Sequence, residues 1–154
     1  MKVCQQEDDI LGYPAQMEHP QRLSPLTLAF LGDAVYELMV RHYLTMQGSM
    51  PAHLLHQKAV ELVRCSAQAQ AYRLLEEHLH EDELAILKRG RNNSSVKSPK
   101  NADPIEYRMA TGVEALFGYL FLSGEQKRLE QLFQMILSKE IQPAQQDEQP
   151  DTDK

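Results

Sequence analysis

The stretch from Leu28 to Arg41 constrains the fold most, because it places a glycine and a carboxylate inside an apolar helix. Ser24 followed by Pro25 has the pattern of an N-cap and first-turn proline, so we expect a helix to begin there. A glycine in mid-helix costs up to about 1 kcal/mol relative to alanine, which indicates that something approaches Gly32 closely. A buried charge is costly unless it is paired or bound to a metal, so Asp33 is a candidate functional residue.

One helical turn after Asp33, Glu37 falls on the same face of this helix. Two interpretations are open at this point. The two acids form a functional pair, or they simply face water and pair with Arg41. The stretch taken alone favours the second interpretation slightly.

The helical spacing of apolar residues along the rest of the chain predicts an all-α fold. We expect an irregular lead-in over 1–22, one helical domain over 23–140 and a disordered acidic tail over 141–154. We expect six helices. The first spans about 25–47, the second begins at Pro51, and the third has Ser66 as its N-cap. The fourth runs from Glu81 to a C-cap at Gly90, the fifth runs from Asp103 to Ser123, and the sixth contains Leu129 to Leu137.

The charge is unevenly spread over the 154 residues, whose formal net charge is -6. Five of the 22 acids and one of the 16 bases lie from Glu140 onward, so the rest of the chain is nearly balanced. The overall acidity therefore does not argue against a polyanionic partner. Cys4 and Cys65 are typical of reduced thiols in a cytoplasmic protein, and we expect neither a signal peptide nor a membrane span.

A basic stretch follows the fourth expected helix. Thirteen residues from Lys88 to Lys100 contain five bases and no acid, together with asparagines and serines. Such side chains contact phosphates, which favours RNA binding over the alternative of a merely solvated loop. The candidate RNA-binding residues are Lys88, Arg89, Arg91, Asn92, Lys97 and Lys100.

A second acid, Glu114, lies on another apolar helix. Helical spacing puts it on one face with Tyr107, Thr111 and Gly118, and these small neighbours allow another helix or a ligand to approach. By itself Glu114 is weak evidence for a functional site, because a surface glutamate beside a tight helix crossing would show the same pattern. Together with Asp33 it could hold Mg²⁺, which prefers oxygen ligands and serves in phosphodiester cleavage.

Three motifs in this order resemble a known family. Leu-Gly-Asp-Ala-Val at 31–35 is similar to the signature helix of the ribonuclease III domain, and Glu-Ala-Leu-Phe-Gly at 114–118 is similar to its second acidic motif. The longer matches at 30–37, 87–92 and 114–120 resemble the Mini-ribonuclease III branch, which has the catalytic domain and no double-stranded-RNA-binding domain. The resemblance covers about residues 24–137, and it implies that 23–140 is a catalytic domain.

Two positions depart from full-length ribonuclease III. Ala29 and Thr111 stand where that family has a glutamate and an aspartate, although the Mini-ribonuclease III branch resembles this chain at both. Glu37 is a tentative substitute ligand, and a structural role for it is about equally supported.

The resemblance implies a Mg²⁺-dependent endoribonuclease that cuts double-stranded RNA, maturing the ends of the 23S ribosomal RNA precursor. It implies Asp33 and Glu114 as catalytic metal ligands, 5′-phosphate products and a homodimer, and it leaves a ribosomal-protein partner open. For the dimer interface we expect contributions from Phe117, Tyr119 and Phe121.

Two alternatives remain open. The missing acids at Ala29 and Thr111 support a ribonuclease III fold that has lost catalysis and binds RNA or ribosomes. A helical adaptor that binds only proteins is the weaker alternative, because the basic loop argues against it.

Overall fold

The computed structural model describes residues 16–93 and 97–141, and within them the chain is all-helical. Of the predicted tail over 141–154, Ile141 is helical and the rest lies outside the described residues, as do Cys4 and residues 1–15 of the predicted lead-in. The elements are a short 3₁₀ helix η1 (Pro20–Arg22) and six α-helices: α1 (Pro25–Met46), α2 (Ala52–Val63), α3 (Cys65–Leu75), α4 (Glu81–Arg91), α5 (Pro104–Leu122) and α6 (Gln126–Ile141).

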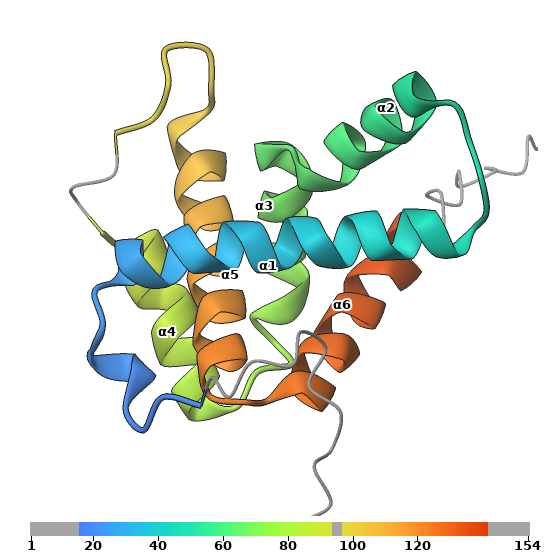
Figure 1. The fold of residues 1–154 in the computed structure, drawn as a ribbon. Coiled ribbons are helices and arrows are strands. Elements are labelled where there is room, and N and C mark those ends of the chain that lie inside the picture. Colours follow the sequence, from blue (N-terminus) through green and yellow to red (C-terminus); the bar gives the residue numbers. More distant parts are fainter. Residues whose placement is uncertain (1–15, 94–96, 142–154) are drawn as a thin grey trace, which may run out of the picture.

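Helix α5 is the central element of the fold. It packs against α1, α3 and α4, and Figure 1 shows α1 crossing it in the middle of the molecule. Val113, Leu116, Phe117 and Leu120 of α5 are almost fully buried. An edge-to-face aromatic cluster extends this core to α6, since the Tyr36 ring centroid lies 5.0 Å from that of Phe117 and 5.9 Å from that of Phe133.

The predicted caps of the two long helices are confirmed. Ser24 Oγ accepts a hydrogen bond from the Thr27 backbone N–H at 3.2 Å. At the start of α5, Asp103 Oδ1 accepts from the backbone N–H of Ile105 at 2.8 Å. Gly48 follows α1 with φ +108°, a backbone conformation that glycine adopts readily, so the predicted stop is also confirmed.

Two predicted helix ends are wrong. Helix α3 begins at Cys65, and the extended residue Arg64, rather than Ser66, stands at its N-cap position. Helix α4 does not end at Gly90 but continues to Arg91, because Gly90 is buried where α4 meets α5. A Cβ atom there would lie 2.8 Å from the Cα of Gly112, so the glycine allows close helix packing rather than a left-handed turn.

A buried ion pair joins α4 to α6. Glu83 is 2% exposed, and its Oε1 and Oε2 each accept a hydrogen bond of 2.9 Å from the Arg128 guanidinium. Arg128 Nη2 also donates to the backbone carbonyl oxygen of His78 at 2.9 Å. The pairing satisfies a charge that would otherwise be costly to bury. None of the described helices is both long and apolar enough to span a membrane.

Candidate active site

Helices α1 and α5 cross with their backbones in contact, and two glycines make this possible. A methyl group on Gly32 would overlap the backbone carbonyl oxygen of Glu114 and would lie 2.8 Å from the backbone nitrogen of Gly118. A methyl group on Gly118 would overlap the carbonyl oxygen of Leu28. The sequence predicted a close approach at Gly32, and the approaching segment is the second acidic helix. The crossing places Asp33 beside Glu114.

The two predicted catalytic acids therefore share one site on different helices. Asp33 is exposed and Glu114 is half-buried. Burial, and next the negative charge of Asp33, raise the pKa of Glu114 from 4.5 to about 7, while a hydrogen bond from the Gln68 side chain opposes this rise. Two carboxylates that repel each other in a partly dry site are a favourable place for a divalent cation.

The donor set fits Mg²⁺. This ion usually keeps several waters and binds proteins through one or two carboxylates, so a pair of acids next to solvent suffices. No group of three or more histidine, cysteine, aspartate or glutamate side chains within 16–93 and 97–141 is placed to hold a metal. The pair of Asp33 and Glu114 is thus suited to the Mg²⁺ ion that the sequence predicts.

Glu37 is not brought into this pair as a third ligand. Its Oε1 accepts from Arg41 Nη2 at 2.8 Å, one turn further along α1, which is the ion pair that the simpler interpretation of this helix expected. Ala29 and Thr111 occupy the positions of the two missing family acids, and both are buried. The Thr111 hydroxyl donates to the Tyr107 carbonyl oxygen of its own helix at 2.9 Å.

The predicted RNA-binding residues divide into two groups. Lys88, Asn92, Lys97 and Lys100 are exposed. Arg91 is half-buried, and its guanidinium carbon lies 5.5 Å from the ring centroid of Tyr72, a cation–π contact that restrains it.

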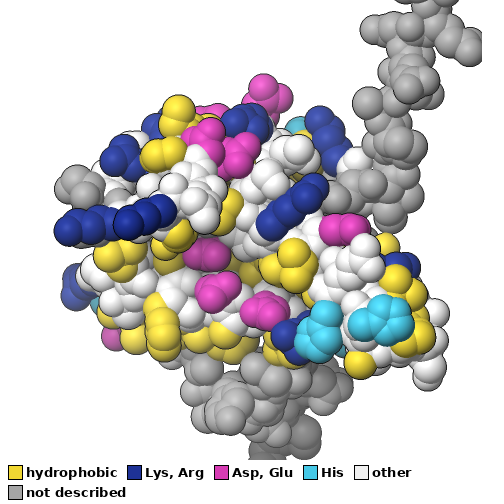
Figure 2. Space-filling model, turned by 90° about the horizontal axis from the view of Figure 1, so that it is seen from above, with side chains coloured by type: hydrophobic (Ala, Val, Ile, Leu, Met, Phe, Trp, Pro, Cys, Tyr) yellow, Lys and Arg dark blue, Asp and Glu magenta, His cyan; other side chains and the backbone are white. Residues whose placement is uncertain are grey.

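Arg89 has contacts that sequence reasoning did not foresee. Its Nη1 donates to the backbone carbonyl oxygen of Gln21 at 2.9 Å, and its Nη2 lies 3.5 Å from that of Leu23. It therefore ties α4 to the segment before α1. Figure 2 shows the resulting surface, with Asp and Glu side chains in the middle of one face and Lys and Arg side chains on either side of them.

The expected interface aromatics are placed differently from the prediction. Phe117 is fully buried in the core, so the prediction that it lies at a subunit interface is wrong. Tyr119 is half-buried, and its hydroxyl donates to Asp82 Oδ2 at 3.2 Å. Phe121 packs partly against the core. Within the part of the chain that the structure describes, the large exposed aromatic side chain is instead Phe30 on α1, at 83%.

Helix α3 supplies site residues that the sequence analysis missed. Gln68 is 2% exposed, and its side chain opposes the rise in the pKa of Glu114. The pKa of the Cys65 thiol is raised by burial first, and then by the charges of Glu114 and Glu106. The available signal was Gln68 itself, a polar residue on the same helical face as Tyr72 and Leu75.

Comparison with known proteins agrees with this geometry. The Ribonuclease III domain family matches residues 26–125. Mini-ribonuclease 3 of Brevibacillus brevis is 47% identical over 119 residues, which are 77% of this chain and 89% of that protein. Mini-ribonuclease 3 of Clostridium tetani is 38% identical over 129 residues, which are 83% and 85% of the two chains.

A crystal structure of a protein from Fusobacterium nucleatum superposes with a TM-score of 0.71 at 27% identity. The match covers 80% of this chain and 99% of that one. The resemblance of the three sequence motifs is thereby confirmed. The chain belongs to the Mini-ribonuclease 3 branch of the ribonuclease III family, and it is an endoribonuclease.

Proposed function

We propose that this endoribonuclease uses Mg²⁺ to cut double-stranded RNA, and that its substrate is the stem joining the two ends of the 23S ribosomal RNA precursor. The single observation that carries the chemistry is the pairing of Asp33 with Glu114 across the glycine crossing of α1 and α5. The choice of the ribosomal RNA precursor rests on the Mini-ribonuclease 3 relatives.

Asp33 and Glu114 would hold the metal, and each contributes differently. When bound, Mg²⁺ supplies an activated water and neutralises charge on the leaving oxygen. Asp33 is exposed and can reach a phosphate that arrives from solvent. Glu114 lies deeper, where partial exclusion of water strengthens its electrostatic interactions. In-line hydrolysis at such a site leaves a 5′-phosphate and a 3′-hydroxyl.

The basic residues around this acidic pair would hold the RNA backbone. Duplex RNA is recognised largely through phosphates and 2′-hydroxyls, so lysines and a restrained arginine beside the acids suit it. Arg91, Lys97 and Lys100 are the proposed contacts with phosphates, and Lys88 and Asn92 extend the same surface. Arg89 is also a candidate, although its contacts with Gln21 and Leu23 give it a structural role.

A homodimer would bring two such sites to one duplex. Leu26, Phe30 and Leu38 are exposed and recur at multiples of four residues along α1, which makes an apolar stripe. A groove lined by Leu38, Met46 and Phe133 lies next to it, between α1 and α6. Burying this surface against a second copy would remove exposed apolar area from water and give one site for each RNA strand.

The decisive experiment incubates the pure protein with the precursor stem, with an unrelated duplex of equal length, and with single-stranded RNA. We expect cuts in duplex substrates with Mg²⁺, none with chelator, and 5′-phosphate ends at the cuts. Preference for the precursor stem, alone or with large-subunit ribosomal proteins, supports the proposed substrate. Equal cleavage of the two duplexes, both with and without the ribosomal proteins, would contradict the proposed substrate.

The alternative of a ribonuclease III fold without catalysis is not supported, because the chain belongs to a branch of endoribonucleases. Ala29 and Thr111, which stand where full-length ribonuclease III has two carboxylates, are buried in this fold.

A further inference from the structure

Tyr72 on α3 is 1% exposed, and its ring lies under the guanidinium of Arg91, the last residue of α4. We propose that Tyr72 is a positioning residue, whose ring holds Arg91 in the orientation that binds one phosphate of the duplex. This inference rests on the proposed function, in which Arg91 contacts RNA. It adds a residue of α3 that is too buried to contact RNA itself.

The contact between Tyr72 and Arg91 is the first observation. The guanidinium carbon lies 5.5 Å from the ring centroid, within the roughly 6 Å over which the face of a ring attracts a cation. Arg91 is half-buried, so less water competes with this attraction than at an exposed site. The Tyr72 hydroxyl is buried and has no hydrogen-bond partner within 16–93 and 97–141, so the ring carries the contact.

A second contact restrains the same guanidinium. Arg91 Nε donates to Asn92 Oδ1 at 3.0 Å. Neither contact uses the terminal nitrogens Nη1 and Nη2, and the pairing of arginine with phosphate frequently uses two parallel N–H donors. Ordering a side chain with many rotamers on binding costs affinity, so an arginine that is already restrained should bind a phosphate more tightly.

Gly112 on α5 makes room for both residues. A Cβ atom on Gly112 would lie 3.2 Å from Cε2 of Tyr72 and 3.3 Å from the backbone nitrogen of Arg91. Tyr72 and Arg91 therefore both pack against α5 at this glycine, two residues before the proposed ligand Glu114. This packing fixes Arg91 on the helix that carries one of the two proposed metal ligands.

The test measures binding of a fluorescently labelled RNA duplex to the full chain in chelator, by fluorescence anisotropy. Tyr72→Leu removes the ring, whereas Tyr72→Phe keeps the ring and removes the hydroxyl. We expect Tyr72→Leu to bind the duplex roughly 2- to 10-fold more weakly than the wild type, because Arg91 must then be ordered on binding. Tyr72→Phe should restore the affinity of the wild type.

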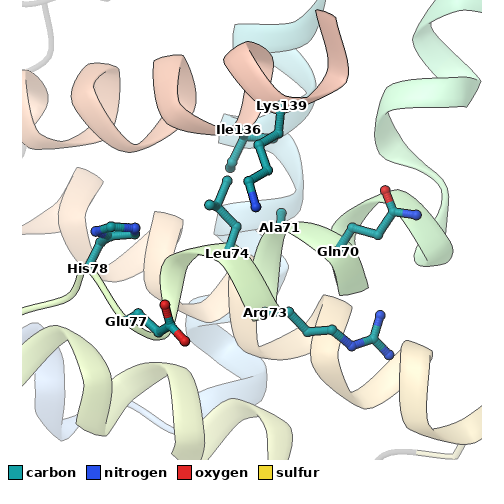
Figure 3. Close-up of a pocket in the computed structure, with 8 residues that line it drawn as sticks. All are labelled: Gln70, Ala71, Arg73, Leu74, Glu77, His78, Ile136 and Lys139. Carbon is teal, nitrogen blue, oxygen red and sulfur yellow. The ribbon is translucent and has the colours of Figure 1, made fainter. Parts of the chain in front are cut away.

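A double-mutant cycle with Arg91→Ala distinguishes positioning from a merely structural effect. If Tyr72 acts through Arg91, Tyr72→Leu should cause no further loss of affinity in the Arg91→Ala background. The control for charge is Arg73→Ala. Arg73 follows Tyr72 on α3 but lines a separate cavity between α3 and α6, together with Gln70 and Lys139 (Figure 3). In the Arg73→Ala background the full loss from Tyr72→Leu should remain.

The outcomes separate this inference from the proposed function. Unchanged affinity in Arg91→Ala would contradict the proposed phosphate contact, and with it the positioning role. A loss in Arg91→Ala with unchanged affinity in Tyr72→Leu would overturn the positioning role alone. An equal loss in Tyr72→Phe, or a further loss from Tyr72→Leu in the Arg91→Ala background, would also overturn it.

A second variant decides the question if Tyr72→Leu fails to fold, as judged by circular dichroism. Phenylalanine with fluorine atoms on its ring, incorporated at position 72, keeps the ring in place. Fluorine withdraws electron density from the ring face and so weakens its attraction for a cation. This variant should bind the duplex more weakly than Tyr72→Phe, and equal affinities of the two would overturn the proposal.

Discussion

The raised pKa of Glu114 predicts that the metal-free protein becomes less stable as the pH rises. The folded state holds the Glu114 proton more tightly than the unfolded chain, because burial and Asp33 disfavour the carboxylate. Between pH 4.5 and about 7 the folded protein therefore carries more protons than the unfolded one. The free energy of unfolding must fall across this interval and level off above it.

The magnitude follows from the size of the pKa change. Raising a pKa from 4.5 to about 7 corresponds to about 3 kcal/mol, and the partial solvent access of Glu114 reduces this to about 2 kcal/mol. Glu114→Gln keeps the shape and removes the titration. Relative to this variant, the wild type should lose about 2 kcal/mol of stability between pH 4.5 and pH 8.

The assay is urea denaturation in chelator at pH 4.5, 6 and 8, for the wild type, Glu114→Gln and Glu37→Gln. Glu37 is the control, because its ion pair with Arg41 is partly exposed and such pairs contribute roughly 0–1 kcal/mol. At pH 8, Mg²⁺ should stabilise the wild type and not Glu114→Gln. Parallel pH profiles for the wild type and Glu114→Gln would refute the argument.

Further predictions follow from the site and the fold. Asp33→Asn should lower cleavage by orders of magnitude while circular dichroism stays unchanged, and activity within a few-fold of wild type would contradict its role as a ligand. Arg91→Ala should weaken duplex binding and flatten its salt dependence, measured by fluorescence anisotropy, because fewer counterions are released. Arg89→Ala should instead lower thermal stability, by about 1 kcal/mol for the lost hydrogen bonds. A salt slope equal to that of the wild type in both arginine variants would place neither arginine on RNA. Gly32→Ala should destabilise by several kcal/mol in urea, since its methyl group overlaps a backbone carbonyl that cannot move aside. Phe30→Glu should produce a monomer in analytical ultracentrifugation, and an unchanged dimer would exclude the α1 stripe as the interface.

The sequence was sufficient to predict that the chain is helical and to single out Asp33 and Glu114, whose helices cross in the structure. Ser24, Asp103 and Gly48 act through their immediate neighbours, so local rules locate the corresponding helix ends. Gly32 and Asp33 were also recognisable as candidate functional residues, because each is unfavourable within an apolar helix unless another part of the protein or a ligand lies close to it. At Gly32 the structure supplies that part as the backbone of Glu114 on α5, whereas Asp33 is exposed to solvent.

Other residues have neighbours that are distant in the sequence, so local rules could not predict their contacts. Gly90 has the local pattern of a helix C-cap, but its neighbour is Gly112 on α5. The sequence around Phe117 is compatible with either a surface or a core position, and only the packing of α1 and α6 shows that it lies in the core. Arg89 looks like any base in a basic stretch, whereas it binds backbone carbonyls more than sixty residues earlier in the chain.

The glycine crossing also has a consequence for protein synthesis. Asp33 and Glu114 are separated by about 80 residues, and the contact between their helices closes a loop of that length. Closing such a loop costs about 4 kcal/mol of chain entropy before any packing compensates for it. While α5 remains inside the ribosomal exit tunnel, a nascent chain has α1 but not the surface on which α1 packs. The acidic pair therefore forms only after α5 has left the tunnel, so a nascent chain that has not reached this point carries no assembled pair.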